Sequence, residues 1–166
     1  MNKSFKLSLV LLGMWLGMTC LIDFVAVPAA FRLIPSRQVA GTFGMYIFNT
    51  FNYVEVVFAF IFLGLTFSYR GQIKFKKTYG LISICLIFLS SLYAFYMTPR
   101  IAEVNEAKWN LLEDSNEYRV LDQEHQYLHN TFRKTDSVKI LILLFLIGAG
   151  VTRKDNDEII INGKVA

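Results

Sequence analysis

The chain has 166 residues, of which 54% are hydrophobic and 15% are aromatic, while charged residues make up only 18%. A typical soluble domain carries about 25% charged residues, so this composition excludes an ordinary water-soluble domain and indicates a membrane protein. The formal net charge is +4. The basic residues lie at the ends of apolar runs, which suits membrane topology and not a nucleic-acid-binding surface.

Four apolar segments follow one another, at about residues 7–34, 46–69, 79–98 and 138–151. A bilayer core requires about 17 to 25 helical residues, so the first three segments are long enough to span it. The fourth is short, and its helix could begin in the polar stretch before it. The sequence therefore predicts an all-α fold, a four-helix transmembrane bundle over residues 1–152, followed by a cytoplasmic tail over residues 153–166.

Basic residues set the predicted orientation in the cell membrane. They concentrate at both termini and in the short loop between the second and third spans, which contains Arg70, Lys74, Lys76 and Lys77. The positive-inside rule places these regions, including both termini, in the cytoplasm. The loop over residues 99–137 then lies outside. Its apolar residues recur at helical spacing, which predicts two amphipathic helices, the second of which could run on into the fourth span.

Two carboxylates lie within the apolar segments, Asp23 in the first and Glu55 in the second. Such groups cost about 2.5 to 3.5 kcal/mol at the centre of a transmembrane helix and usually face the interior of a bundle. At about 1.5 Å of rise per residue, both fall in the outer half at overlapping depths and could meet. Asn52 lies one turn before Glu55, and Arg100 lies at the outer rim as a potential charge partner.

This polar group has two competing interpretations. The carboxylates could bind a proton or a metal cation, because two close carboxylates cannot easily both be ionised. Alternatively, they pair with Arg100, Asn52 or tyrosines and only fix the register of the helices. A third outcome is that Asp23 and Glu55 do not meet.

Two further patterns suggest weaker sites. His125 and His129 are four residues apart, so on a helix they share a face and could contribute to a metal or haem site, although surface histidines are the more common explanation. Gly13 and Gly17 form a small-xxx-small pair, which allows close helix packing. Motifs typical of nucleophilic, phosphate-binding or zinc-protease enzymes are not found.

Several short stretches resemble the DUF4149 family of transmembrane protein 205-like proteins. FVAVPAAFRLIPSRQVAGTFG resembles the end of the family's first helix, where Pro28, Phe31, Ala40 and Gly41 match. MTPRI resembles the family's Pro-Arg pair near the end of the third helix, matched by Pro99 and Arg100. YLHNTFRKTDSVKILILL resembles the region of the family's histidine before the last helix, matched by His129. The resemblance implies a four-helix integral membrane protein and assigns no activity. Asp23 and Glu55 are not carried over from the family.

The resulting hypothesis is a small non-enzymatic protein of the lipid bilayer that binds or helps to transport a proton or metal cation. The alternative is a structural or accessory subunit that holds a second copy of itself or another membrane protein, for example through the Gly13–Gly17 face. A weaker alternative is a haem or metal enzyme that uses His125 and His129. None of these involves nucleic acid.

Overall fold

The structure, a computed structural model, describes residues 3–68 and 73–152, without the side chains of residues 73–76. The described chain is helical between short connections, which confirms the predicted all-α fold. The elements in order are α1 (Lys3–Leu21), η1 (Ile22–Ala26), α2 (Val27–Leu33), α3 (Arg37–Ser68), α4 (Ile73–Leu92), η2 (Tyr93–Met97), α5 (Thr98–Trp109) and α6 (Asn116–Val151). Arg70 and the predicted tail at 153–166 lie outside the described residues.

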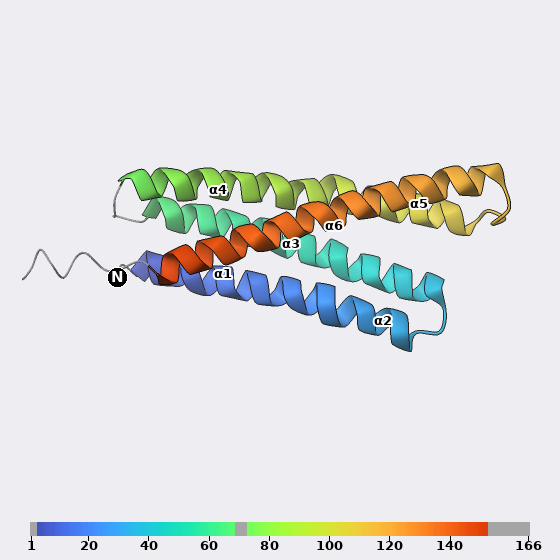
Figure 1. Ribbon diagram of the computed structural model, residues 1–166, viewed down its shortest axis with the longest axis horizontal. Helices are drawn as coiled ribbons and strands as arrows, with labels where there is room; N and C mark the ends of the chain where they lie inside the picture. The colour runs from blue at the N-terminus through green and yellow to red at the C-terminus, as the bar shows by residue number, and fades with distance from the viewer. Residues whose placement is uncertain (1–2, 69–72, 153–166) are drawn as a thin grey trace, which may run out of the picture.

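These elements form four antiparallel rods that run up and down beside one another (Figure 1). The start of α1 and the end of α6 lie at one end of the bundle. The α2–α3 and α5–α6 connections lie at the other end, here called the distal end. Because α6 crosses the bundle obliquely, it packs against α1 in one part of its length and against α5 in another.

Three of the rods are long and apolar enough to cross a membrane, namely Lys3–Leu33, Arg37–Ser68 and Lys77–Trp109. Large apolar side chains on these rods point outward, among them Phe24, Phe60 and Phe88. Polar side chains such as Thr19 and Ser83 are buried instead. This distribution is the reverse of that in a water-soluble domain and fits contact with lipid. The predicted fourth span, 138–151, forms the last part of α6, and its crossing of the bilayer stays a prediction.

Two prolines explain the π-helical turns in the first and third rods. Pro28 follows η1 and Pro99 follows η2 at the same spacing, and each ends a Phe-x-x-x-Pro sequence that begins at Phe24 or Phe95. Proline lacks a backbone N–H, and its ring collides with the carbonyl four residues earlier. A widened turn just before the proline accommodates the ring and keeps the rod continuous.

The predicted helices of the 99–137 loop are extensions of the spanning rods. α5 continues the third rod, and α6 is one unbroken helix of 36 residues. The Ser115 hydroxyl caps α6 by accepting a bond from the Tyr118 N–H. Lys108 Nζ on α5 lies 3.0 Å from Asp122 Oδ1 on α6. This ion pair lowers the pKa of Asp122 and ties the two extensions together at the distal end.

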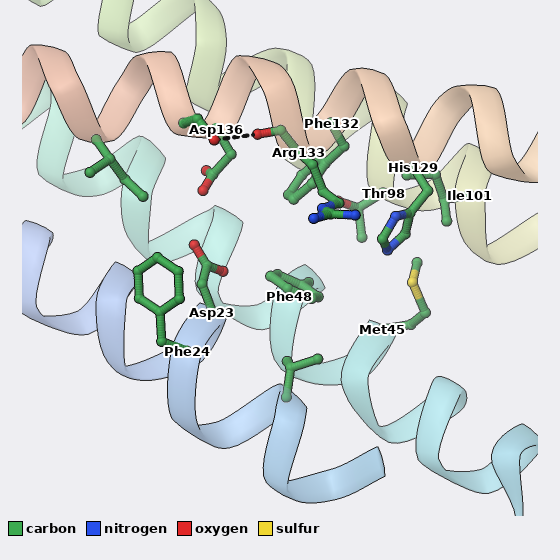
Figure 2. Close-up of a pocket in the computed structure, with 13 residues that line it drawn as sticks. Asp23, Phe24, Met45, Phe48, Thr98, Ile101, His129, Phe132, Arg133 and Asp136 are labelled. Carbon is green, nitrogen blue, oxygen red and sulfur yellow. Dashed lines mark hydrogen bonds between the residues drawn. The ribbon is translucent and has the colours of Figure 1, made fainter. Parts of the chain in front are cut away.

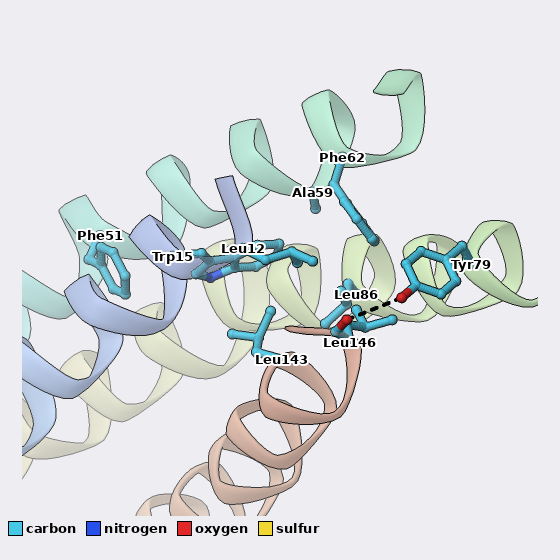
Figure 3. Packing of buried hydrophobic residues seen from close by; sticks show 9 residues of the cluster. All are labelled: Leu12, Trp15, Phe51, Ala59, Phe62, Tyr79, Leu86, Leu143 and Leu146. Carbon is cyan, nitrogen blue, oxygen red and sulfur yellow. Dashed lines mark hydrogen bonds between the residues drawn. The ribbon is translucent and has the colours of Figure 1, made fainter. Parts of the chain in front are cut away.

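A hydrophobic cluster closes the half of the bundle nearest the chain ends. It consists of Leu12, Trp15, Phe51, Ala59, Phe62, Tyr79, Leu86, Leu143 and Leu146 (Figure 3). Within it, the Tyr79 hydroxyl donates to the Leu146 carbonyl over 3.1 Å, which links α4 to α6. Beyond this cluster, α6 approaches α1 closely at Gly150. A Cβ atom placed there would collide with Leu9 and touch Phe5.

The close approach at Gly150 predicts a position-specific packing defect. Gly150→Val should lower the free energy of unfolding in detergent by about 1 to 3 kcal/mol relative to Gly148→Val, because overpacking costs about that much. Gly148 is the matched control, since a Cβ there meets open space and both substitutions change helix propensity alike. Thermal unfolding followed by circular dichroism measures the difference. Equal melting temperatures would contradict the packing of α6 on α1.

Candidate functional site: a buried carboxyl cluster beside a cavity

The Glu55 side chain lies at the centre of the bundle with none of its surface exposed. Its Oε1 atom accepts hydrogen bonds from Trp15 Nε1 at 2.8 Å, from Lys139 Nζ at 2.6 Å and from the Thr19 hydroxyl at 3.4 Å. Three elements, α1, α3 and α6, therefore converge on one carboxylate oxygen. The other oxygen, Oε2, has no partner among the described residues.

Lys139 connects Glu55 to a second carboxylate. Its Nζ atom lies 2.5 Å from Asp136 Oδ1, three residues earlier on α6, and 5.2 Å from the centre of the Tyr93 ring in η2. Only 2% of the Lys139 side chain is exposed. A buried ammonium requires compensating charge and hydrogen bonds, and here two carboxylates and an aromatic ring supply them.

Asp23 extends this arrangement toward the surface of the bundle. It lies in the π-helical turn η1 and is partly buried. Figure 2 shows the Asp23 and Asp136 side chains pointing toward one another from η1 and α6. Two carboxylates that face one another in a poorly solvated site repel each other unless one of them is protonated. Asp23, Asp136, Lys139 and Glu55 are called the carboxyl cluster below.

A cavity of about 360 Å³ adjoins the carboxyl cluster on its distal side. Asp23 and Asp136 lie at one end of it, and His129 and Arg133 toward the other (Figure 2). Its remaining wall is mostly apolar and comes from four rods. The residues that form this wall are Phe24, Val27, Met45, Phe48, Thr98, Ile101, Phe132, Ser137 and Ile140.

The structure brings together only some of the residues that the sequence singled out. Asp23 and Glu55 belong to one cluster, but Asp136 and Lys139 join them. Asn52 donates to the Thr98 hydroxyl over 2.7 Å and so supports the cavity wall from α3. Arg100 pairs with Glu124 at 2.6 Å and Glu103 at 2.9 Å, which places the potential charge partner in the distal extension and not beside the buried acids.

His125 and His129 share a face of α6 as their spacing predicts, with ring centres 5.9 Å apart. Burial lowers the pKa of both, helped by the charges of Lys108 and His129 at His125 and of Arg133 at His129. Both are therefore mostly uncharged at neutral pH. Within residues 3–68 and 73–152, no three His, Cys, Asp or Glu side chains are grouped so that they could hold a metal ion.

Gly13 and Gly17 lie on the outer surface of α1. A Cβ atom at either position would meet no neighbouring atom within 4 Å. The close packing predicted for this pair is therefore not made with another helix within the described part of the chain.

The sequence interpretation missed Lys139, although a pattern could have revealed it. Lys139 is the second residue of the predicted fourth span, and no role was predicted for it. The buried positions of α6 are Phe132, Asp136, Lys139, Leu143, Leu146 and Gly150. They alternate steps of four and three residues, which is the spacing of a helix face that packs into a bundle. Asp136 and Lys139 both lie within this stripe of buried positions.

The family described as Domain of unknown function (DUF4149) matches residues 10–110, which confirms the resemblance seen in the sequence. The matched region contains Trp15, Asp23 and Glu55, while Asp136 and Lys139 follow it. No curated protein and no solved structure matches the chain.

The buried ion pair predicts an asymmetric double-mutant cycle. Lys139→Met should lower the free energy of unfolding by about 3 to 5 kcal/mol, because it leaves buried carboxylates without a cation. Adding Glu55→Gln to that variant should restore part of the loss, since the amide carries no charge. Chemical denaturation in detergent measures all three variants. If the two substitutions are additive, Glu55 and Lys139 do not interact as described.

Proposed function

This chain belongs to the DUF4149 family, and we propose that it is a non-enzymatic membrane protein that binds and exchanges a proton at the carboxyl cluster. The observation that carries this proposal is the pair Asp23 and Asp136, whose carboxyl groups point toward one another at the end of a cavity that both residues line. A single proton held between them would relieve the repulsion between two carboxylates in a poorly solvated site.

The charges of the cluster support a proton site. Three carboxylates and one ammonium group leave a formal excess of two negative charges when all are ionised. One proton shared by Asp23 and Asp136 removes one of these, and Arg133, which lines the cavity, offsets the other. Asp23 is the carboxylate that Lys139 stabilises least, since the ammonium group bonds to Glu55 and Asp136. Asp23 is therefore the group most suited to gain and lose the proton.

The same contacts favour a proton over a metal cation. Lys139 already occupies Oε1 of Glu55 and one oxygen of Asp136, so a metal ion would have to displace an ammonium group. Hard cations also need about six oxygen ligands, and the adjoining wall is largely apolar. The hydrophobic cluster around Leu86 and Leu146 separates the carboxyl cluster from the opposite end of the bundle. The proton therefore exchanges through the distal side.

One observation favours a second candidate function, an accessory subunit of a membrane complex. Gly13 and Gly17 present a small-residue face on the outer side of α1. Among the described residues, no neighbouring atom lies within 4 Å of a Cβ placed at either position, so a helix of another protein or of a second copy could pack there. In that case the carboxyl cluster has only a structural role, and neutral substitutions in it alter stability without altering proton binding.

We further propose that the distal end faces out of the cell and that both termini are cytoplasmic. Lys3 and Lys6 lie at the end of the bundle where α6 also ends, which agrees with the positive-inside rule. With Cys20 and Cys85 replaced by serine, a membrane-impermeant maleimide added to intact cells should label Leu112→Cys and not Thr152→Cys. Both positions are exposed, and lysis should make both reactive. The opposite labelling would invert the proposed orientation.

The proton site itself is tested by infrared spectroscopy of the protein in lipid nanodiscs. The C=O stretch of a protonated carboxyl group should be present at neutral pH and should shift in D₂O. Asp23→Asn and Asp136→Asn should each remove it, because each eliminates one partner of the shared proton. Asp114→Asn is the control, since Asp114 is exposed in the α5–α6 connection. A wild-type protein without this band would overturn the proposal and favour the accessory role.

A further inference from the structure

We infer that the cavity binds a small, apolar organic ammonium ion, which replaces the proton shared by Asp23 and Asp136. This inference rests on the proposed proton site and assigns it a class of ligand. The starting observation is the position of the cavity. It lies against the carboxyl cluster and has a volume of about 360 Å³, within the range of about 300 to 1,000 Å³ that is typical of small-molecule sites.

The composition of the cavity wall fits a cation with an apolar body. Asp23 and Asp136 form the acidic end, and the rings of Phe24, Phe48 and Phe132 lie around the space that they face (Figure 2). Aromatic faces attract ammonium groups, by up to about 2 kcal/mol where water is excluded. Phe48 and Phe132 also pack edge to face, with ring centres 5.6 Å apart, so the wall has a defined shape.

The charges around Asp23 allow a one-for-one exchange. Asp136 and Lys139 of α6 and Glu55 of α3 lie close to Asp23, and His129 and Arg133 of α6 line the same cavity toward its other end. Because His129 is mostly uncharged, it does not repel a cation at neutral pH. A ligand with one positive charge replaces the positive charge that the cluster loses when the proton leaves, so the net charge of the site stays the same. The O–H bond of the protonated carboxyl group breaks, its electron pair stays on the carboxylate, and the proton passes to solvent. No other covalent bond changes.

Access to the cavity comes from the surface of the first rod. Phe24 lines the cavity, yet 68% of its surface is exposed, and Val25 beside it is 55% exposed. The cavity therefore borders the lipid-facing surface. An apolar ammonium ion that partitions into the membrane reaches it without crossing the distal extension.

A phospholipid headgroup fits the same cavity less well. Its ammonium group would lie nearer the membrane surface than its phosphate. In the cavity the acidic residues Asp23 and Asp136 lie deeper in the bundle than the basic side chain of Arg133. The order of the charges is thus the reverse of that in a phospholipid headgroup. A compact cation whose ammonium group lies beside the acidic residues, deep in the bundle, fits the cavity better.

Isothermal titration calorimetry with benzyltrimethylammonium tests the inference. The protein in detergent is titrated at neutral pH in two buffers that differ in ionisation enthalpy, so the number of released protons is obtained directly. Wild-type protein should bind the cation and release close to one proton. Asp23→Asn should weaken binding roughly tenfold and release none. Phe24→Leu, which leaves the carboxyl groups in place, should weaken binding and keep the proton release.

Controls separate the charge of the probe from its apolar body. Benzenesulfonate, of similar size and opposite charge, and sodium ions, which lack an apolar body, should not bind. Asp114→Asn should behave like wild type. Absence of binding in a protein that still shows the protonated carboxyl band overturns this inference and leaves the proton site standing. Equal binding to wild type and Asp23→Asn, or binding without proton release, also overturns it. Absence of the protonated carboxyl band from the wild-type protein would instead refute the proton site.

Discussion

The ion pair between Glu55 and Lys139 is the constraint around which the bundle is organised. Each group is almost completely buried, and each would be costly without the other. Glu55 also accepts bonds from Trp15 and Thr19, and Lys139 also contacts Asp136 and the Tyr93 ring. All four rods therefore contribute a side chain to one connected polar centre. Lipid offers no hydrophobic driving force between helices, so such directional contacts fix how the rods are arranged.

The two π-helical turns position this centre. η1 carries Asp23 and η2 carries Tyr93, and both turns arise because a proline lies two residues after the end of each. The first and third rods thus contain a widened helical turn where the polar side chains meet. On the distal side the rods make room for the cavity, while on the other side the cluster around Leu86 and Leu146 is tightly closed. The polar centre is consequently accessible from one side, which suits binding and release.

The fold was largely predictable from the sequence, because the hydrophobic runs around Phe60 and Phe88 are long enough to admit little but membrane-spanning helices. The involvement of Asp23 and Glu55 was also predictable, since charges in such runs must face inward. Their partner was not. The depth of Arg100 in the predicted bundle made it the expected charge partner, but its side chain pairs with Glu124 on the distal part of α6. Lys139 lies at the edge of a short apolar run, and only the path of α6 across the bundle shows that it is buried.

The most direct test of this account is solid-state NMR of the protein in lipid bilayers, with ¹⁵N at lysine side chains and ¹³C at glutamate carboxyl groups. A through-space cross-peak is expected between the Lys139 ammonium nitrogen and the Glu55 carboxylate carbon. The cross-peak should vanish in both Lys139→Met and Glu55→Gln. A wild-type spectrum without it, or one in which it survives either substitution, would contradict the polar centre on which the proton site and the cavity's proposed ligand both depend.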